Sequence, residues 1–319
     1  MNCAAFPSAC NFVHRPQSGL RHGFLALFLW GLSVSLSGAA AGVLRYCDED
    51  GVVRPEAQSR LLQLSQIAKE ELQAADALVA LASTAGLDLD RLSIRYSHMG
   101  ISVAQSPHGP WSVRQLYFDC AQSKSRLFDQ GMAGFITGRQ PAEVVYLSLV
   151  IVPPSAATAL VDAALNNARA LALLGQTYSA NAYPFSTLYQ NCNQWVLEML
   201  ASAWGAVEAG EGARQEAQQW LGSQGYSPDV VQVSWAPLMW LSGQIPWLHR
   251  DDHPAADQDA QLYRISLPKS IESFVQSIQP DSQRIELCMQ KDQVVIRRGW
   301  QPMGPQCVPE NGDEVRVLN

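Results

Sequence analysis

The sequence is poor in charge, and the charge that it carries is mostly acidic. Only 16% of its 319 residues are charged, and 22 Lys and Arg stand against 29 Asp and Glu. Nucleic-acid-binding proteins usually carry a basic face, and no cluster of Lys or Arg occurs in this chain, so we expect no nucleic-acid partner. A hydrophobic content of 47% excludes intrinsic disorder and predicts a folded core.

Several sequence patterns that carry chemistry are also missing. The chain has no glycine-rich phosphate loop, no dinucleotide-binding fingerprint and no G-x-S-x-G nucleophile turn, so we expect no cofactor. It has no internal repeats. After the first forty residues, no apolar run reaches the roughly 20 residues that a membrane-spanning helix needs.

The first forty residues have the pattern of an export signal. Arg15, Arg21 and His22 precede an apolar run over 23–36, and small residues follow as far as Ala41. This order is typical of a secretory signal peptide. A transmembrane anchor is the alternative, but the fully apolar core is short and contains serines. We therefore predict cleavage near Ala41, a periplasmic or secreted protein, and no stable membrane anchor after cleavage.

Export changes the interpretation of the cysteines. The mature chain keeps Cys47, Cys120, Cys192, Cys288 and Cys307. Thiols tend to pair in oxidising compartments, and an odd number leaves one over. Four cysteines allow three pairings, between which the sequence does not decide. We expect Cys288 with Cys307, which lie in one C-terminal strand pair, and Cys47 with Cys120, so that Cys192 remains single.

Hydrophobic periodicity predicts a mixed chain. The expected strands cover 93–103 and 111–119, joined as a hairpin by a turn over 107–110, then 144–152, 283–289 and 293–298. The expected helices cover 55–76, 123–130, 156–174, 192–204, 211–221 and 269–278. Residues 77–82 fit either a strand or the end of the first helix, and 249–261 is charged and predicts an exposed loop.

This order of elements predicts an α+β fold in which an antiparallel sheet packs against helices. We expect three parts: the signal peptide over 1–41, a main domain over 42–235, and a small mixed C-terminal extension over 236–319 that contains a loop, a helix and a β-hairpin.

Cys192 is the first candidate for chemistry. Asn191 is a good N-cap, and Gln194 occupies the partner position of a capping box, which places Cys192 at the first position of a helix. The helix dipole and unpaired backbone N–H groups there favour thiolate and lower the pKa of a cysteine. The alternative is an inert core residue, because Cys192 shares a helical face with Trp195 and Met199.

A thiolate needs a base, and His98 is the leading candidate. It lies in a predicted strand, and Gly100, two residues later on the same face, leaves room for another element to approach closely. The next strand should supply a residue that orients the imidazole. Gln115 is the leading candidate for that role, and Asp119 lies further along the same face. The alternative is a hydrogen-bonded, half-buried histidine without a catalytic role.

Two short patterns carry a resemblance to a known group. Ser97 to Ile101 has the form S-H-x-G-I, and about ninety residues later Asn191 to Val196 has the form N-C-N-x-W-V. This order resembles the circularly permuted papain-like hydrolases, relatives of the NlpC-type cell-wall peptidases and of the lecithin–retinol acyltransferase group.

The chain also resembles the domain-of-unknown-function family 2145 of exported bacterial proteins. The resemblance spans most of residues 45–280. It rests on Cys47, the strand that ends at Cys120, the Asn191-Cys192-Asn193 sequence, and the segments 251–254 and 268–271.

The resemblance implies a permuted papain-like fold with assigned roles. Cys192 is then the nucleophile, His98 the base and Gln115 the third residue. A neutral glutamine can orient imidazole but does not stabilise imidazolium as a carboxylate does. Tyr183 and Tyr189, just before the cysteine, are candidates for the oxyanion hole or substrate binding, together with Asn191.

These roles predict a cysteine hydrolase of the peptidase or amidase type that forms an acyl-enzyme. Export predicts a cell-envelope substrate, which could be a peptide, peptidoglycan or a lipid. One alternative is an acyltransferase on the same fold. Another is a catalytically silent domain that binds an envelope partner, for which Trp235, Trp240 and Trp247 offer an apolar surface, although such aromatic residues are more often buried core.

A metal site is a further alternative. His249 and His253 are four residues apart around Asp251 and Asp252, which is a spacing that suits metal ligands on a helix. The segment has the sequence of a loop, however, so we expect a solvated charged turn and no metal.

Overall fold

We describe the protein from a computed structural model, in which residues 55–85, 89, 93–137, 143–232 and 247–318 are described. The predicted signal peptide, Cys47, Trp235 and Trp240 lie outside these residues. None of the described helices is both long and apolar enough to cross a membrane.

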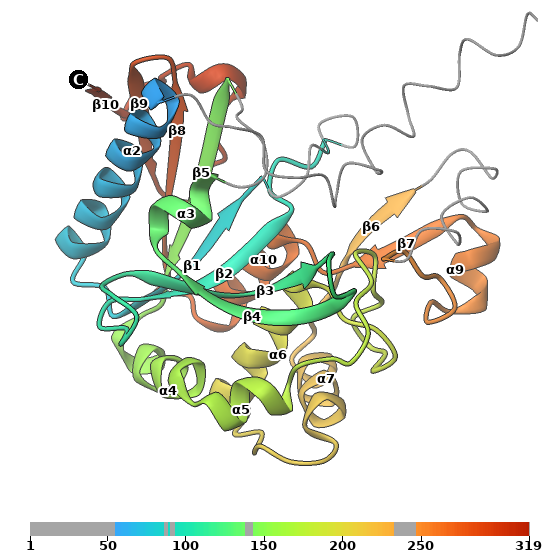
Figure 1. The fold of residues 1–319 in the computed structure, drawn as a ribbon. Coiled ribbons are helices and arrows are strands. Elements are labelled where there is room, and N and C mark those ends of the chain that lie inside the picture. The colour runs from blue at the N-terminus through green and yellow to red at the C-terminus, as the bar shows by residue number, and fades with distance from the viewer. Residues whose placement is uncertain (1–54, 86–88, 90–92, 138–142, 233–246, 319) are drawn as a thin grey trace, which may run out of the picture. The chain divides into compact units, whose positions relative to one another are not determined.

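An eight-stranded sheet organises the described chain, with the strand order β10-β9-β8-β5-β1-β2-β3-β4 (Figure 1). Every neighbouring pair in this sheet is antiparallel. The strands are β1 (Val79–Thr84), β2 (His98–Val103), β3 (Ser112–Asp119), β4 (Lys124–Gln130), β5 (Val144–Ile151), β8 (Gln283–Gln290), β9 (Gln293–Arg298) and β10 (Glu314–Val317). A separate antiparallel pair consists of β6 (Asp229–Gln232) and β7 (Leu262–Ile265).

Runs of strands and runs of helices follow one another along the chain, and with the antiparallel sheet they confirm the mixed α+β class. They are α2 (Pro55–Ala74), α3 (Met132–Thr137), α4 (Pro154–Leu165), α5 (Asn167–Ala172), α6 (Cys192–Trp204), α7 (Ala213–Ser223), α9 (Ala255–Asp259) and α10 (Pro268–Ile278), with a short 3-10 turn, η3, at Pro305–Cys307.

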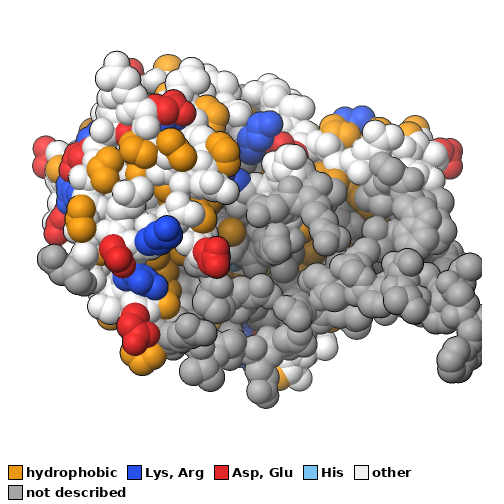
Figure 2. All heavy atoms as spheres, turned by 90° about the horizontal axis from the view of Figure 1, so that it is seen from above, with side chains coloured by type: hydrophobic (Ala, Val, Ile, Leu, Met, Phe, Trp, Pro, Cys, Tyr) orange, Lys and Arg blue, Asp and Glu red, His pale blue; other side chains and the backbone are white. Residues whose placement is uncertain are grey.

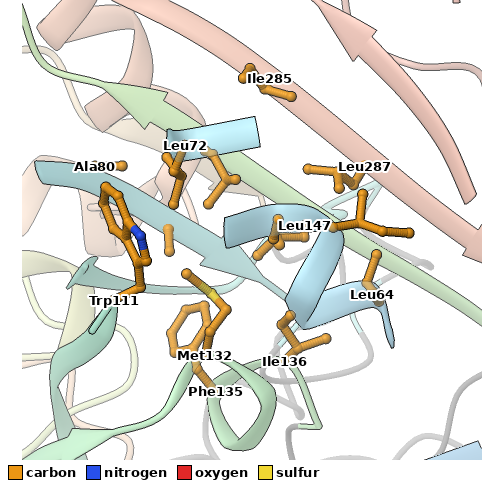
Figure 3. Packing of buried hydrophobic residues seen from close by; sticks show 14 of the residues in the cluster. Leu64, Leu72, Ala80, Trp111, Met132, Phe135, Ile136, Leu147, Ile285 and Leu287 are labelled. Carbon is orange, nitrogen blue, oxygen red and sulfur yellow. The ribbon is translucent and has the colours of Figure 1, made fainter. Parts of the chain in front are cut away.

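The main core lies between one face of the sheet and the helices α2 and α3. Helix α2 starts at a proline, which suits a first turn, and its leucines recur at helical spacing on the face that packs on the sheet. Figure 3 shows how these side chains meet side chains from β1, β5 and β8. The labelled members of the cluster are Leu64, Leu72, Ala80, Trp111, Met132, Phe135, Ile136, Leu147, Ile285 and Leu287.

The opposite face of the sheet packs against α4, α6 and α10. Arg114 of β3 donates to the carbonyl of Ala164 in α4 at 2.7 Å. Ser83 of β1 donates to Glu272 of α10 at 3.1 Å. Helix α6 contacts β2 and β3 on this side. The chain thus forms a helix–sheet–helix arrangement, in which the predicted cysteine helix α6 is buried against the sheet and contacts α4, α7 and α10.

Two predicted helices differ from the structure. Residues 124–130 form strand β4, whose side chains alternate between exposed and half-buried, because pairing with β3 gives this polar segment seven backbone partners. The predicted helix over 156–174 is two helices, since Asn166 ends α4 with an extended backbone. The same residue caps α5, where its side chain accepts from the N–H of Arg169 at 3.1 Å.

The segment 249–261 is only in part the exposed loop that its charge predicted. Asp252 and His253 are only 8% and 4% exposed, and the short helix α9 follows them. Each has one backbone partner: Asp252 accepts from the N–H of Tyr183 at 2.7 Å, and Nε2 of the His253 ring lies 2.8 Å from the carbonyl of Asn181.

One of the two predicted cysteine pairs lies entirely within the described residues. Cys288 and Cys307 form a disulfide that links β8 to η3, and this pairing is confirmed. Cys120 is also disulfide-bonded, while Cys47, its predicted partner, lies outside the described residues. Among the described cysteines, Cys192 is the free one.

A buried charged cluster ties the segment before β2 to β8. Glu286 of β8 accepts from the Tyr96 hydroxyl at 2.6 Å and from Arg95 at 3.0 Å. Arg284 and the backbone N–H of Met303 also donate to this carboxylate, at 3.0 and 2.7 Å. A carboxylate that receives four donors keeps its charge even when buried, and its pKa is lowered, chiefly by Arg284 against the opposing effect of burial.

The described surface in Figure 2 carries basic and acidic side chains beside one another, with small apolar groups between them. The described part of this face has no large patch of one charge, which agrees with the low and mixed charge of the sequence.

The core predicts a sharp contrast between two leucines of α2. Leu64 is fully buried, whereas Leu62 is 54% exposed. Replacing Leu64 by alanine should lower the free energy of unfolding by about 2–5 kcal/mol, because it removes buried methyl groups and leaves a cavity. Leu62→Ala should change it by less than about 0.5 kcal/mol. Denaturant titration of both variants measures the difference, and equal losses would contradict this packing.

Candidate active site

Helix α6 begins at Cys192, as the sequence predicted. The side chain of Asn191 accepts from the backbone N–H of Gln194 at 2.7 Å, and Asn191 itself has an extended backbone. The Gln194 side chain does not close the capping box but donates to Glu198 at 3.1 Å. The N-cap therefore fixes where the helix starts, and it places Cys192 in the first turn, where backbone N–H groups point outward.

Asn193 anchors this first turn to the start of β2. Its side-chain nitrogen donates to the carbonyl of Ser97 and to that of Ser266, each at 3.0 Å. Asn193 is buried, so these bonds replace the water that its amide would otherwise bind. The result is that Cys192 lies beside the backbone on either side of His98.

The sulfur of Cys192 lies where the hydrogen-bonded ladder between β2 and β3 stops. That ladder pairs residues 101–103 with 112–114. Beyond its end, the backbone N–H of Met99, the Tyr178 hydroxyl and the N–H groups of Cys192 and Asn193 lie near enough to the sulfur to lower its pKa. The thiol in turn lies 3.7 Å from the side-chain oxygen of Asn193. This ring of donors is suited to hold negative charge on sulfur or on a nearby oxygen.

Burial nevertheless controls the protonation of the thiol. Cys192 is only 7% exposed, and burial raises its pKa to about 12, although each of the surrounding donors lowers it. The lowered pKa that the helix N-terminus predicted is therefore wrong for this structure, because loss of water around the thiolate outweighs the dipole and the hydrogen bonds. The thiol is the resting form at neutral pH.

The structure brings His98 and Gln115 together. The ring nitrogen Nε2 of His98 lies 2.7 Å from Oε1 of Gln115, and Gln115 donates through its Nε2 to Gln130 at 2.8 Å. With the amide in this orientation, Gln115 accepts from His98, so the imidazole carries its hydrogen on Nε2 and its lone pair on Nδ1. Asp119, the other orienting candidate, pairs with Arg126 at 3.1 Å.

Gly100 makes the contact between His98 and Gln115 possible. A Cβ atom at this position would lie 2.5 Å from the side chain of Val113, 3.0 Å from the backbone oxygen of Arg114 and 3.2 Å from Cβ of Gln115. Only glycine allows β3 to approach so closely. The space that the sequence predicted beside His98 is thus occupied by β3 itself.

His98 and Cys192 come to β2 from opposite faces of the sheet. The His98 ring lies 4.6 Å from the ring of Tyr117. The ring of Tyr178, which donates to the sulfur, lies 5.1 Å from that of Phe118. Consecutive strand residues point to opposite faces, so the imidazole lies on the side of α2 and α3, and the sulfur arrives with α6. Strand β2 therefore lies between the imidazole and the sulfur.

Tyr183 and Tyr189, the two tyrosines predicted for the oxyanion hole, make contacts away from the Cys192 sulfur. Tyr189 donates to Asp251 at 3.1 Å and stacks on the ring of His249 at 4.2 Å. The Tyr183 ring lies 5.6 Å from the ring of His253. The tyrosine at the sulfur is Tyr178, which sequence reasoning missed. Its position in a tyrosine-rich loop before the cysteine was the available signal, but the loop conformation decides which tyrosine turns inward.

The predicted metal alternative finds no geometric support in the described residues. His249 stacks on Tyr189, and His253 uses Nε2 on the carbonyl of Asn181, so the two rings serve different contacts. Within the described ranges, no group of three or more His, Cys, Asp or Glu side chains is arranged to hold a metal ion.

Comparison with known proteins gives one family. A family model described as "Uncharacterized protein conserved in bacteria (DUF2145)" matches residues 71–275, a range that contains the residues of this site. Searches of curated proteins and of solved structures found no match.

The raised pKa of Cys192 predicts how stability depends on pH. A thiol with a pKa near 9.0 when unfolded and about 12 when folded stabilises the native state below pH 9, and this contribution is lost as pH rises toward 12. Relative to Cys192→Ser, the wild type should lose roughly 1.4 kcal/mol between pH 7 and pH 10. Urea denaturation across that range measures the loss, and parallel curves would show that the thiol is not buried in its neutral form.

Proposed function

We propose that this chain, which belongs to the DUF2145 family of bacterial proteins, is an exported cysteine hydrolase of the peptidase or amidase type. The observation that carries the proposal is the arrangement around β2. The sulfur of Cys192 lies near the backbone N–H of Met99, and the preceding residue, His98, is held in one tautomer by Gln115 at 2.7 Å. Acyl transfer by this route requires both a nucleophile and an oriented base.

The proposed reaction proceeds in two stages. His98 Nδ1 takes the thiol proton as the Cys192 sulfur bonds to the substrate carbonyl carbon, and the carbonyl oxygen becomes an oxyanion. The Tyr178 hydroxyl and the backbone N–H groups at the start of α6 stabilise that oxygen. The imidazolium then protonates the leaving amine or alcohol as its bond to carbon breaks. Water, activated by the same imidazole, hydrolyses the thioester and restores the thiol.

The protonation states set the character of this chemistry. Because burial holds Cys192 as a thiol, the proton leaves during attack, and no thiolate–imidazolium pair exists beforehand. Gln115 orients the imidazole without adding negative charge beside the imidazolium.

The permuted papain-like fold is part of the proposal. Its support is the order of the parts along the chain: the strand pair that carries His98 and Gln115 comes first, and the helix that opens with Cys192 follows and packs against that sheet. Export to the periplasm or beyond is supported by the Cys288–Cys307 disulfide, because such bonds persist in oxidising compartments. A substrate in the cell envelope is proposed from that location.

A second candidate is a catalytically silent domain that binds an envelope partner. The observation in its favour is that Cys192 is 7% and His98 4% exposed, and that the two side chains approach β2 from opposite faces. In that case Cys192 and His98 are structural, and neither depends on the other for its reactivity.

Acylation by a small activated ester separates the two candidates. With p-nitrophenyl acetate, the wild type should acetylate Cys192, as read by mass spectrometry of its peptide and by release of p-nitrophenol. Cys192→Ala should abolish the reaction, and His98→Ala should slow it by about 10²–10⁴-fold, the usual contribution of a general base.

The matched control is His108→Ala. His108 is a half-exposed histidine whose side chain lies 3.5 Å from Asp129, and its loss should leave the acetylation rate unchanged. Equal rates for the wild type and His98→Ala would rule out the hydrolase and leave the silent domain.

A further inference from the structure

Backbone contacts with Gln190 hold the segment that carries Tyr178. The N–H of Gln190 donates to the carbonyl of Thr177, and its carbonyl accepts from the N–H of Ser179, both at 3.1 Å. These bonds flank the tyrosine on both sides and form an isolated parallel bridge between Tyr178 and Gln190. The backbone position of Tyr178 is therefore set by that of Gln190.

The side chain of Gln190 is itself fixed by buried groups. It is fully buried; its oxygen accepts from the N–H of Gly175 at 2.7 Å, and its nitrogen donates to the carbonyl of Leu173 at 2.8 Å and to Glu198 at 2.6 Å. A Cβ at Gly175 would lie 2.8 Å from Cβ of Gln190, so the close approach of these two residues requires glycine.

Glu198 of α6 and Arg214 of α7 complete the support. Arg214 donates to both carboxylate oxygens of Glu198, at 2.9 and 3.1 Å, and its other donors bind the carbonyls of Thr187 and Tyr189 at 2.7 and 2.9 Å. A two-point contact between guanidinium and carboxylate has a defined geometry. The charged pair therefore fixes the loop from residue 187 to the cysteine helix.

We infer that Gln190 is a positioning residue that holds the Tyr178 hydroxyl against the Cys192 sulfur. The inference deepens the proposed function and takes its chemical meaning from it. Gln190 acts through Tyr178, which is the group that meets the sulfur and would meet the oxyanion. Without the Gln190 amide, the bridge loses its attachment to Gly175, Leu173 and Glu198, and the hydroxyl is no longer confined to one place.

A double-mutant cycle with iodoacetamide tests this link. The rate of Cys192 alkylation at a fixed, mildly alkaline pH is followed by mass spectrometry for the wild type, Tyr178→Phe, Gln190→Met and the double variant. Loss of one hydrogen bond to the thiolate raises the pKa by about one unit; the thiolate is then scarcer but more nucleophilic, so the rate falls about threefold. Each single variant should show this fall, and the double variant should show no further fall.

Gln218→Met is the matched control. Gln218 donates to the same Glu198 carboxylate at 2.9 Å, but its other bond goes to Ser186 and not to the segment of Tyr178. It should leave the alkylation rate unchanged with either residue at position 178. If Gln190→Met fails to fold, Gly175→Ala displaces Gln190 without altering its amide and should reproduce the same non-additive fall.

An effect of Gln190→Met that is equal in both backgrounds, or no effect at all, would overturn the inference. Equal effects would mean that the variant changes access to the sulfur rather than the hydroxyl. The double-mutant cycle does not depend on His98. It can therefore support the role of Gln190 even if the acetylation experiment rejects the hydrolase. It can also reject that role while the acetylation experiment supports the hydrolase.

Discussion

The arrangement at the cysteine depends on one buried amide, that of Asn193. Its two bonds of 3.0 Å, to Ser97 and Ser266, join the start of α6 to the start of β2 and to the link between β7 and α10. Both acceptors are backbone carbonyls, so the contact does not depend on the identity of those side chains. Because the amide is adjacent to the sulfur in the chain, the position of Cys192 relative to β2 is fixed within one residue of the reactive atom.

Local chemistry in the sequence was sufficient to identify the start of the helix and the pair on the hairpin. Asn191 predicted the cap, and alternation along the two strands placed His98 and Gln115 on one face, where they do meet at 2.7 Å. These features depend on residues close in sequence or on one hairpin. The same alternation could not show that α6 covers the other face of the sheet, because that depends on how helices far along the chain pack.

The sequence-based predictions that the structure contradicts, and the residue that they missed, have different physical causes. Residues 124–130 are polar enough for an exposed helix, and only the neighbouring edge of β3 makes them a strand. Tyr178 was missed because loop backbone bonds, rather than periodicity, turn it toward the sulfur. The direction of the Cys192 pKa was wrong because the dipole of a helix acts locally, whereas desolvation depends on everything that packs above the thiol.

In the sheet order, the C-terminal hairpin of β8 and β9 covers an edge that would otherwise be exposed while the chain folds. Strand β5, an apolar run of eight residues, pairs on one side with β1 and on the other with β8. Everything from β1 to β5 lies within residues 79–151, but β8 begins at Gln283. Until the last part of the chain is synthesised, β5 is an uncovered sheet edge, which is the kind of surface on which chains aggregate. A chain that stops before β8 therefore keeps its candidate site residues, but it exposes β5 as an unpaired edge strand that is prone to aggregation.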